Sequence, residues 1–161
     1  MQRTLMASAM LLALGGCGER TIEASAGNDA NGENSAVASY ASPDGRSEVR
    51  SGDAALSGLP EGIPPYPRAG PNGAIQFGGA SEEGEMRAIG FTTADPPADV
   101  IAFYAEAAQR AGFREGQRAA SGPSQVIGFE RENGEVMNVT ATANPRGTSV
   151  QIMVGNPRRR G

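Results

Sequence analysis

The stretch EVMNVTATANPRGTSVQIMV, residues 135–154, decides the fold because its pattern fits a β-hairpin in only one register. A turn at 144–147 sets Met137 opposite Val154, Val139 opposite Ile152 and Ala141 opposite Val150, so one face is wholly apolar. The other face carries polar side chains: Asn138, Thr140, Thr142, Ser149 and Gln151. This hairpin is therefore predicted to cover a core with one face and to leave the other face to solvent.

A third strand, QVIGFE at 125–130, precedes this hairpin. A three-residue loop over 132–134, with Gly134 left-handed, places Phe129 on the apolar face and pairs Arg131 with Glu135. A two-residue turn would place Phe129 on the polar face instead. We therefore expect the three-residue loop.

The segment DPPADVIAFYAEAAQRAGF, residues 95–113, predicts a helix. We expect Asp95 to cap its N-terminus and Pro96 to occupy the first helical position. Gly112 followed by Phe113 indicates a Schellman turn at its end. Apolar residues recur at helical spacing: Val100, Phe103, Tyr104, Ala107 and Ala111.

Two more strands are expected before this helix, over 74–77 and 86–93. The order is then β-β-α-β-β-β. This order predicts an α+β domain of two layers, in which one helix packs on one face of an antiparallel sheet. The proline-rich segment 58–70 leads into the domain, with Leu59, Ile63 and Tyr66 expected to pack along its edge.

Composition excludes several classes of function. All 14 basic residues are Arg, and the 161 residues contain no Lys, His or Trp. Imidazole acid-base catalysis, Ser-His-Asp triads, Schiff bases and phosphate-binding lysines are therefore absent. With a net charge of −4 and no large basic face, nucleic-acid binding is not expected. We expect no cofactor and no enzyme activity.

The opening of the chain carries a targeting signal. Arg3 precedes a ten-residue apolar run, Leu5 to Leu14, which is too short to span a bilayer and is typical of a signal peptide. The run Leu14-Gly15-Gly16-Cys17 resembles the lipobox of bacterial lipoproteins. The resemblance implies that residues 1–16 are removed and that the Cys17 thiol is diacylated, which anchors the protein to a membrane. Gly18, where many inner-membrane lipoproteins have Asp, implies the periplasmic side of the outer membrane rather than the inner membrane.

The segment between this cysteine and the domain differs in composition. Residues 17–58 are rich in Ala, Ser and Gly, and we predict a disordered tether with a typical reach of about 35 Å. The domain is expected over 59–155. Residues 156–161 form a basic tail that is expected to be solvated, with contact to anionic lipid as the alternative.

One acidic cluster, Glu82, Glu83 and Glu85, is predicted to be a solvated hairpin tip rather than a cation site. The domain as a whole resembles small uncharacterised bacterial envelope domains that begin with a Pro-x-Tyr-Pro segment, here 64–67, and end in a β-meander. No active site comes with that resemblance.

Three functions follow from the sequence. The first is a lipid-anchored interaction or accessory module of the cell envelope, bound to a membrane through Cys17 and to an envelope protein. The second is a periplasmic binding domain for a small polar or glycan ligand on the open sheet face, with Asn138, Thr140, Thr142, Ser149 and Gln151 as its candidate residues. The third, a carboxylate-based hydrolase, is remote because only 5% of the residues are aromatic and could stack on a sugar.

Overall fold

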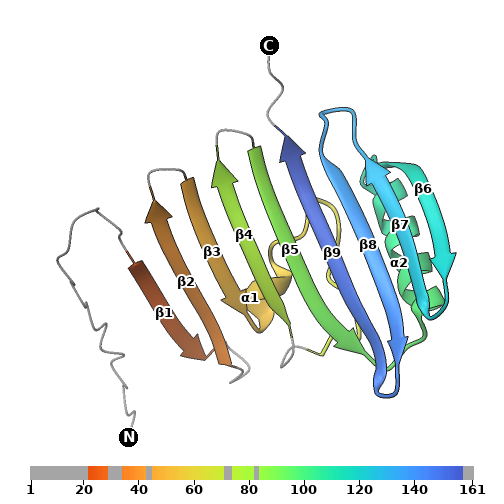
Figure 1. Cartoon of the computed structure of the whole chain (residues 1–161), viewed down its shortest axis with the longest axis horizontal. Helices are drawn as coiled ribbons and strands as arrows, with labels where there is room; N and C mark the ends of the chain where they lie inside the picture. Colours follow the sequence, from red (N-terminus) through yellow and green to blue (C-terminus); the bar gives the residue numbers. More distant parts are fainter. Residues whose placement is uncertain (1–21, 29–33, 43–44, 71–73, 82–83, 158–161) are drawn as a thin grey trace, which may run out of the picture.

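A computed structural model describes residues 22–28, 34–42, 45–70, 74–81 and 84–157. Within these ranges the chain forms nine strands and two helices (Figure 1). The strands are β1 (Ile22–Asn28), β2 (Asn34–Ser42), β3 (Gly45–Ser51), β4 (Ile75–Ser81), β5 (Gly84–Thr93), β6 (Arg114–Ser121), β7 (Ser124–Glu130), β8 (Val136–Asn144) and β9 (Gly147–Pro157). The helices are α1 (Asp53–Leu56) and α2 (Pro97–Arg110).

All nine strands join one antiparallel sheet in the order β1-β2-β3-β4-β5-β9-β8-β7-β6. Strand β1 lies at one edge and β6 at the other, as Figure 1 shows from left to right. Helix α2 packs against β6, β7 and β8, and α1 packs against β2, β3 and β4. We call the face that carries both helices the helix-side face, and the opposite one the open face.

The predicted fold class is wrong in its element order and in the extent of its sheet. Instead of β-β-α-β-β-β with one helix, the described residues follow the order β-β-β-α-β-β-α-β-β-β-β. Strand β6 was missed because all its residues are exposed at the sheet edge, so it has no apolar alternation. The result is a nine-stranded sheet with two helices rather than a compact two-layer α+β domain.

The range 17–58, predicted to be an unstructured tether, contains β1, β2, β3 and α1 in the structure. A segment poor in apolar residues can form strands when an existing sheet edge satisfies its backbone hydrogen bonds. Here β3 pairs with β4 over Arg46–Ser51, and β2 and β1 follow by hairpins. The composition of residues 17–58 does not indicate that the edge of β4 is available for pairing.

The predicted register of the two C-terminal hairpins is confirmed. Val139 lies opposite Ile152, and the three-residue loop places Phe129 opposite Met137. In that loop Gly134 has a φ of 89°, and the Arg131 N–H donates to the Glu135 carbonyl at 2.9 Å. The apolar face of these strands is fully covered and forms the core with α2.

Helix α2 ends as predicted but begins differently. Gly112 N–H donates to the Gln109 carbonyl and Phe113 N–H to the Ala108 carbonyl, which is a Schellman turn. The helix begins at Pro97, and Pro96 rather than Asp95 is its N-cap.

Asp95 has another role, because two side chains of the proline-rich segment bind its carboxylate together. Its Oδ2 accepts a hydrogen bond from the Tyr66 hydroxyl at 2.6 Å and from Arg68 Nε at 2.6 Å. These bonds lower the pKa of Asp95, with the Tyr66 bond as the largest cause. They attach the proline-rich segment to the start of α2. Ile63 and Tyr66 are buried as expected, and Leu59 packs against the core.

Candidate functional site

Two rows of directly opposed residues cross the helix-side face and change their chemistry along the way. From β3 to β7 the first row reads Arg50, Gln76, Ile89, Ile152, Val139 and Ile127. The second row reads Glu48, Gly78, Arg87, Val154, Met137 and Phe129. Toward α2 the rows are apolar and filled, and the first row stays apolar as far as Ile89 on β5. On β3 and β4 the first row is polar, and the second row carries Glu48 on β3 and Arg87 on β5.

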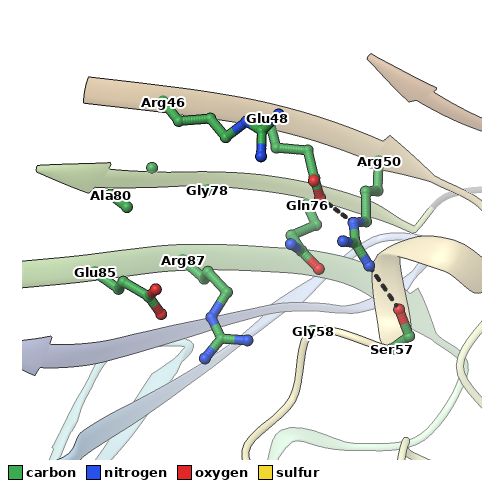
Figure 2. Close-up of a pocket in the computed structure, with 11 residues that line it drawn as sticks. Arg46, Glu48, Arg50, Ser57, Gly58, Gln76, Gly78, Ala80, Glu85 and Arg87 are labelled. Carbon is green, nitrogen blue, oxygen red and sulfur yellow. Dashed lines mark hydrogen bonds and ion pairs between the residues drawn. The ribbon is translucent and has the colours of Figure 1, made fainter. Parts of the chain in front are cut away.

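This polar end of the helix-side face holds a pocket of about 240 Å³, shown in Figure 2. We call it the β3–β5 pocket. Its floor is low because β4 presents Gly78 and Ala80 to this face, and neither has a side chain that could fill the space. Its lining residues are Arg46, Glu48, Arg50, Ser57, Gly58, Gln76, Gly78, Gly79, Ala80, Glu85 and Arg87.

Gln76 is the most unusual of these residues. The residue is 2% exposed, and its Oε1 has no hydrogen-bond partner among the described residues. A buried amide oxygen without a donor costs about 1–3 kcal/mol, so native structures rarely keep one. The amide lies against Gly58, where an added Cβ would meet Oε1 at 1.9 Å. Because Gly58 has no side chain, the Gln76 amide can lie at the wall of the pocket.

Arg50 and Glu48 form an ion pair on β3 at one side of the pocket (Figure 2). Arg50 Nη1 also donates to Ser57 Oγ at 3.2 Å, which ties the strand to the end of α1. The hydrogen bond from Arg50 lowers the pKa of Glu48, so this carboxylate is ionised at neutral pH. A carboxyl group in this state does not suit a general acid.

Arg46 and Arg87 are not members of that ion pair, although the charge of Arg46 also lowers the pKa of Glu48. Neither forms an ion pair or a hydrogen bond with the described residues. Arg46 on β3 lies opposite Ala80, and Arg87 on β5 lies opposite Gly78. The two cations therefore flank the low floor that β4 forms. The pocket as a whole contains three Arg and two Glu side chains, and is therefore cationic in a chain of net charge −4.

The five polar residues predicted from the sequence lie on the open face, away from this pocket. Thr140 lies opposite Gln151 and Thr142 opposite Ser149, so the structure brings them together on β8 and β9. Two of them already have partners, because Thr142 Oγ1 lies 2.9 Å from Ser124 Oγ and Ser149 Oγ accepts from Asn144 Nδ2 at 2.8 Å. Asn138 lies opposite Met153 at the border of an apolar patch. Ligand binding by this group stays a prediction.

The open face also carries large exposed apolar side chains. Phe77 is 52% exposed, Met86 57% and Met153 41%, and the three line a shallow groove of about 320 Å³ over β3, β4, β5 and β9. A second hollow, of about 910 Å³, lies at the β8–β9 turn and includes Ser149 and Arg146. The open face is thus more apolar near β4 and β5 than the sequence predicted.

Several sequence-predicted features lie outside the described residues. These are the lipobox with Cys17, the acidic pair Glu82 and Glu83, and the arginines 158–160 of the tail. Glu85, the third member of the acidic cluster, lies in β5 and lines the β3–β5 pocket. Among the described residues, no helix has the length and hydropathy needed to cross a bilayer.

Sequence reasoning missed the residues of the β3–β5 pocket. A signal was present in Arg46-Ser47-Glu48-Val49-Arg50, where charge recurs at every second position as on one face of a strand. That period-2 pattern lay in a segment interpreted from its composition as a tether. Gln76 gave a second signal, because it interrupts an apolar strand between Ile75 and Phe77.

The chain was compared with known families and proteins. A family model described as START domain-like matches residues 76–153, a little under half of the chain. No curated protein and no solved structure matches the chain. The matched range runs from β4 into β9 and includes Gln76, Gly78 and Arg87 of the pocket, but not β3 or α1. The similarity to this family favours a ligand-binding domain.

Proposed function

We propose that this protein is a lipid-anchored ligand-binding domain of the bacterial cell envelope, facing the periplasm, and that the β3–β5 pocket holds a small polar ligand. The observation that carries the ligand part is the buried Oε1 of Gln76, which has no donor among the described residues. A ligand that donates a hydrogen bond would satisfy it. The START domain-like match supports the same class of function.

The size and chemistry of the pocket support binding rather than catalysis. A volume of about 240 Å³ is below the roughly 300–1,000 Å³ of drug-sized sites, so it suits a small molecule or a headgroup. Glu48 is paired with Arg50 and its pKa is lowered, which leaves it a poor proton donor. We therefore propose no reaction for this pocket.

The anchor part of the proposal rests on the run Leu14-Gly15-Gly16-Cys17 and its apolar h-region. It is tested by growing bacteria that express the full chain with an alkyne analogue of palmitate. The wild type should be labelled and Cys17→Ser should not, while Gln151→Ala, as a control for expression, should keep the label. Absence of label in the wild type, or equal label in Cys17→Ser, would refute the anchor.

The ligand part is tested by thermal shift of the full chain in detergent, against small sugars, polyols, amino acids and organic phosphates. Gly58→Ala should abolish any shift, because its Cβ forces the Gln76 amide out of place. The Gly58 backbone does not have positive φ, so the substitution adds no backbone strain. Gly90→Ala, on the open face of β5 with ordinary contacts of 3.7 Å or more, is the matched control. A shift that persists in Gly58→Ala would place binding elsewhere.

The exposed Phe77, Met86 and Met153 favour a second function, docking of an envelope protein on the open face. Their groove adjoins Asn138 through its pairing with Met153. In-cell photo-crosslinking from Gln151 and Met153, with exposed Arg114 on β6 as the control position, tests this function. One defined adduct from the first two positions supports it, and equal adducts from all three positions contradict it.

A further inference from the structure

We propose that the ligand of the β3–β5 pocket is a small oxyanion, a phosphate or carboxylate, that also carries a hydroxyl group. This proposal rests on the proposed function and names its ligand class. Arg46 and Arg87 would hold the anionic group, and the Gln76 oxygen would accept a hydrogen bond from the hydroxyl. Each part of the assignment follows from a separate feature of the pocket.

The charge balance indicates an anion. Arg50 is neutralised by Glu48, and its Nη1 donates to Ser57. Arg46 and Arg87 form no ion pair with the described residues, although Glu85 lies across Ala80 from Arg46 and Glu48 lies across Gly78 from Arg87. The three arginines and two glutamates that line the pocket leave it one positive charge in excess. Guanidinium groups with unused donors bind carboxylate and phosphate by paired hydrogen bonds.

The geometry leaves room for the ligand between these two arginines. They lie on β3 and β5, the two neighbours of β4, and are offset by two residues because Arg46 is opposite Ala80 and Arg87 is opposite Gly78. With strands spaced by about 4.8 Å and residues by about 3.4 Å, their backbones are roughly 12 Å apart. Gly78 and Ala80 lie between them on the helix-side face. An added Cβ at Gly78 would meet Arg87 Cγ at 3.1 Å, so the Arg87 side chain itself passes over Gly78 and the ligand would lie beside that side chain.

The hydroxyl requirement comes from Gln76. An oxyanion alone offers acceptors and would leave Oε1 unsatisfied, whereas a hydroxyl donates. On β4 the Gln76 Nε2 lies on the Gly78 side of the amide, and Oε1 lies on the Gly58 side, so the hydroxyl would have to reach the Gly58 wall of the pocket (Figure 2). A ligand with an anionic group at one end and a hydroxyl at the other would satisfy both. Phosphate esters of polyols have this form, either as free compounds or as lipid headgroups.

The experiment is calorimetric titration of the full chain in detergent with glycerol 3-phosphate, inorganic phosphate and glycerol. Glycerol 3-phosphate should bind at least tenfold more tightly than either of the others, because each of them supplies only one of the two interactions. Arg87→Gln and Arg46→Gln should each weaken its binding about tenfold. Arg114→Gln, which removes an exposed arginine on β6, should change it less than about twofold.

Two further arms separate the alternatives. Vesicles of phosphatidylglycerol, compared with phosphatidylcholine vesicles, distinguish a lipid headgroup from the free ester, since both contain the same glycerol phosphate chemistry. Arg87→Lys keeps the charge but loses the paired donors, so it should retain partial binding and serves if Arg87→Gln does not fold.

The proposal is overturned if glycerol 3-phosphate does not bind, or if Arg87→Gln and Arg114→Gln weaken it equally. If a neutral polyol binds in a Gly58-dependent way and the phosphates do not, the anion assignment fails while the proposed binding function stands. If no probe binds the wild type, both the anion assignment and the proposed binding function are overturned.

Discussion

The helix-side face contains two regions that share their strands' register and differ in what covers them. Under α2 the row through Ile152 and Val139 is apolar and fully buried. Farther along the same row, Gln76 and Arg50 lie beside the short helix α1, and a pocket remains. The comparison shows that one sheet can supply both a core and a site, because a long amphipathic helix fills only the part that it reaches.

The difference also has an energetic side. Burial of apolar side chains contributes roughly 25 cal/mol per Å², whereas a buried polar group without a partner costs stability. The region under α2 therefore stabilises the fold, and the β3–β5 pocket is a place where stability is given up. Such a place is expected where a ligand binds.

The largest expected effect comes from the filled region. Ile152→Ala should lower the free energy of unfolding by about 3 kcal/mol, because it removes a fully buried side chain and leaves a cavity. Urea denaturation measures it. Arg50→Ala, in the same row, should cost less than about 1 kcal/mol, since the Arg50–Glu48 pair is partly exposed. Equal costs for the two variants would remove the distinction between the regions.

A second prediction concerns the loop that closes the filled region. Arg131 pairs with Glu135 at 2.9 Å, stacks 4.1 Å from the Phe113 ring centre, and donates to the Ala111 carbonyl at the end of α2. Arg131→Met should cost about 2 kcal/mol, because it leaves the Glu135 carboxylate, on an 8% exposed residue, without its cation. Thermal unfolding measures the loss. A Tm equal to that of the wild type would show that the pair is not structural.

Gln76→Leu is expected to stabilise the fold, whereas the two preceding substitutions destabilise it. Leucine fills similar space and removes the oxygen without a donor, so the free energy of unfolding should rise by about 1 kcal/mol. Binding of any pocket ligand should be lost at the same time. Urea denaturation and thermal shift on the same sample measure the two effects. A destabilised Gln76→Leu would mean that the amide is structural and that the two regions are alike.

The smallest expected effect is a pH dependence at the junction of the proline-rich segment and α2. Hydrogen bonds from Tyr66 and Arg68 hold the Asp95 pKa below its ordinary value of 3.8. Asp95 therefore stabilises the fold above that value, and the contribution is lost as pH falls through the lowered pKa. Urea midpoints at pH 6 and pH 3 should differ more in the wild type than in Asp95→Asn. Identical differences would contradict the assignment.

The sequence predicted the regions of the fold that are determined locally. The register of 135–154 follows from side-chain alternation and one turn, and the end of α2 follows from Gly112. Strands β1 to β3 are different, because their pairing depends on the free edge of β4 and not on their own apolar content. The pocket depends on the same long-range pairing, since Arg46 meets Ala80 only after β3 has joined the sheet.

The position of β1 has a consequence for diffusion. It begins at Ile22, and five Cα–Cα steps from Cys17 to Ile22 reach at most about 18 Å. With Cys17 acylated, as proposed, the start of β1 would stay within that distance of the anchored cysteine instead of lying at the end of a long flexible tether. The anchored protein would then search for its ligand within the plane of the membrane. A headgroup ligand would be met by lateral diffusion in the leaflet, at a local concentration set by lipid composition, whereas a soluble ligand would have to enter a thin layer beside the membrane.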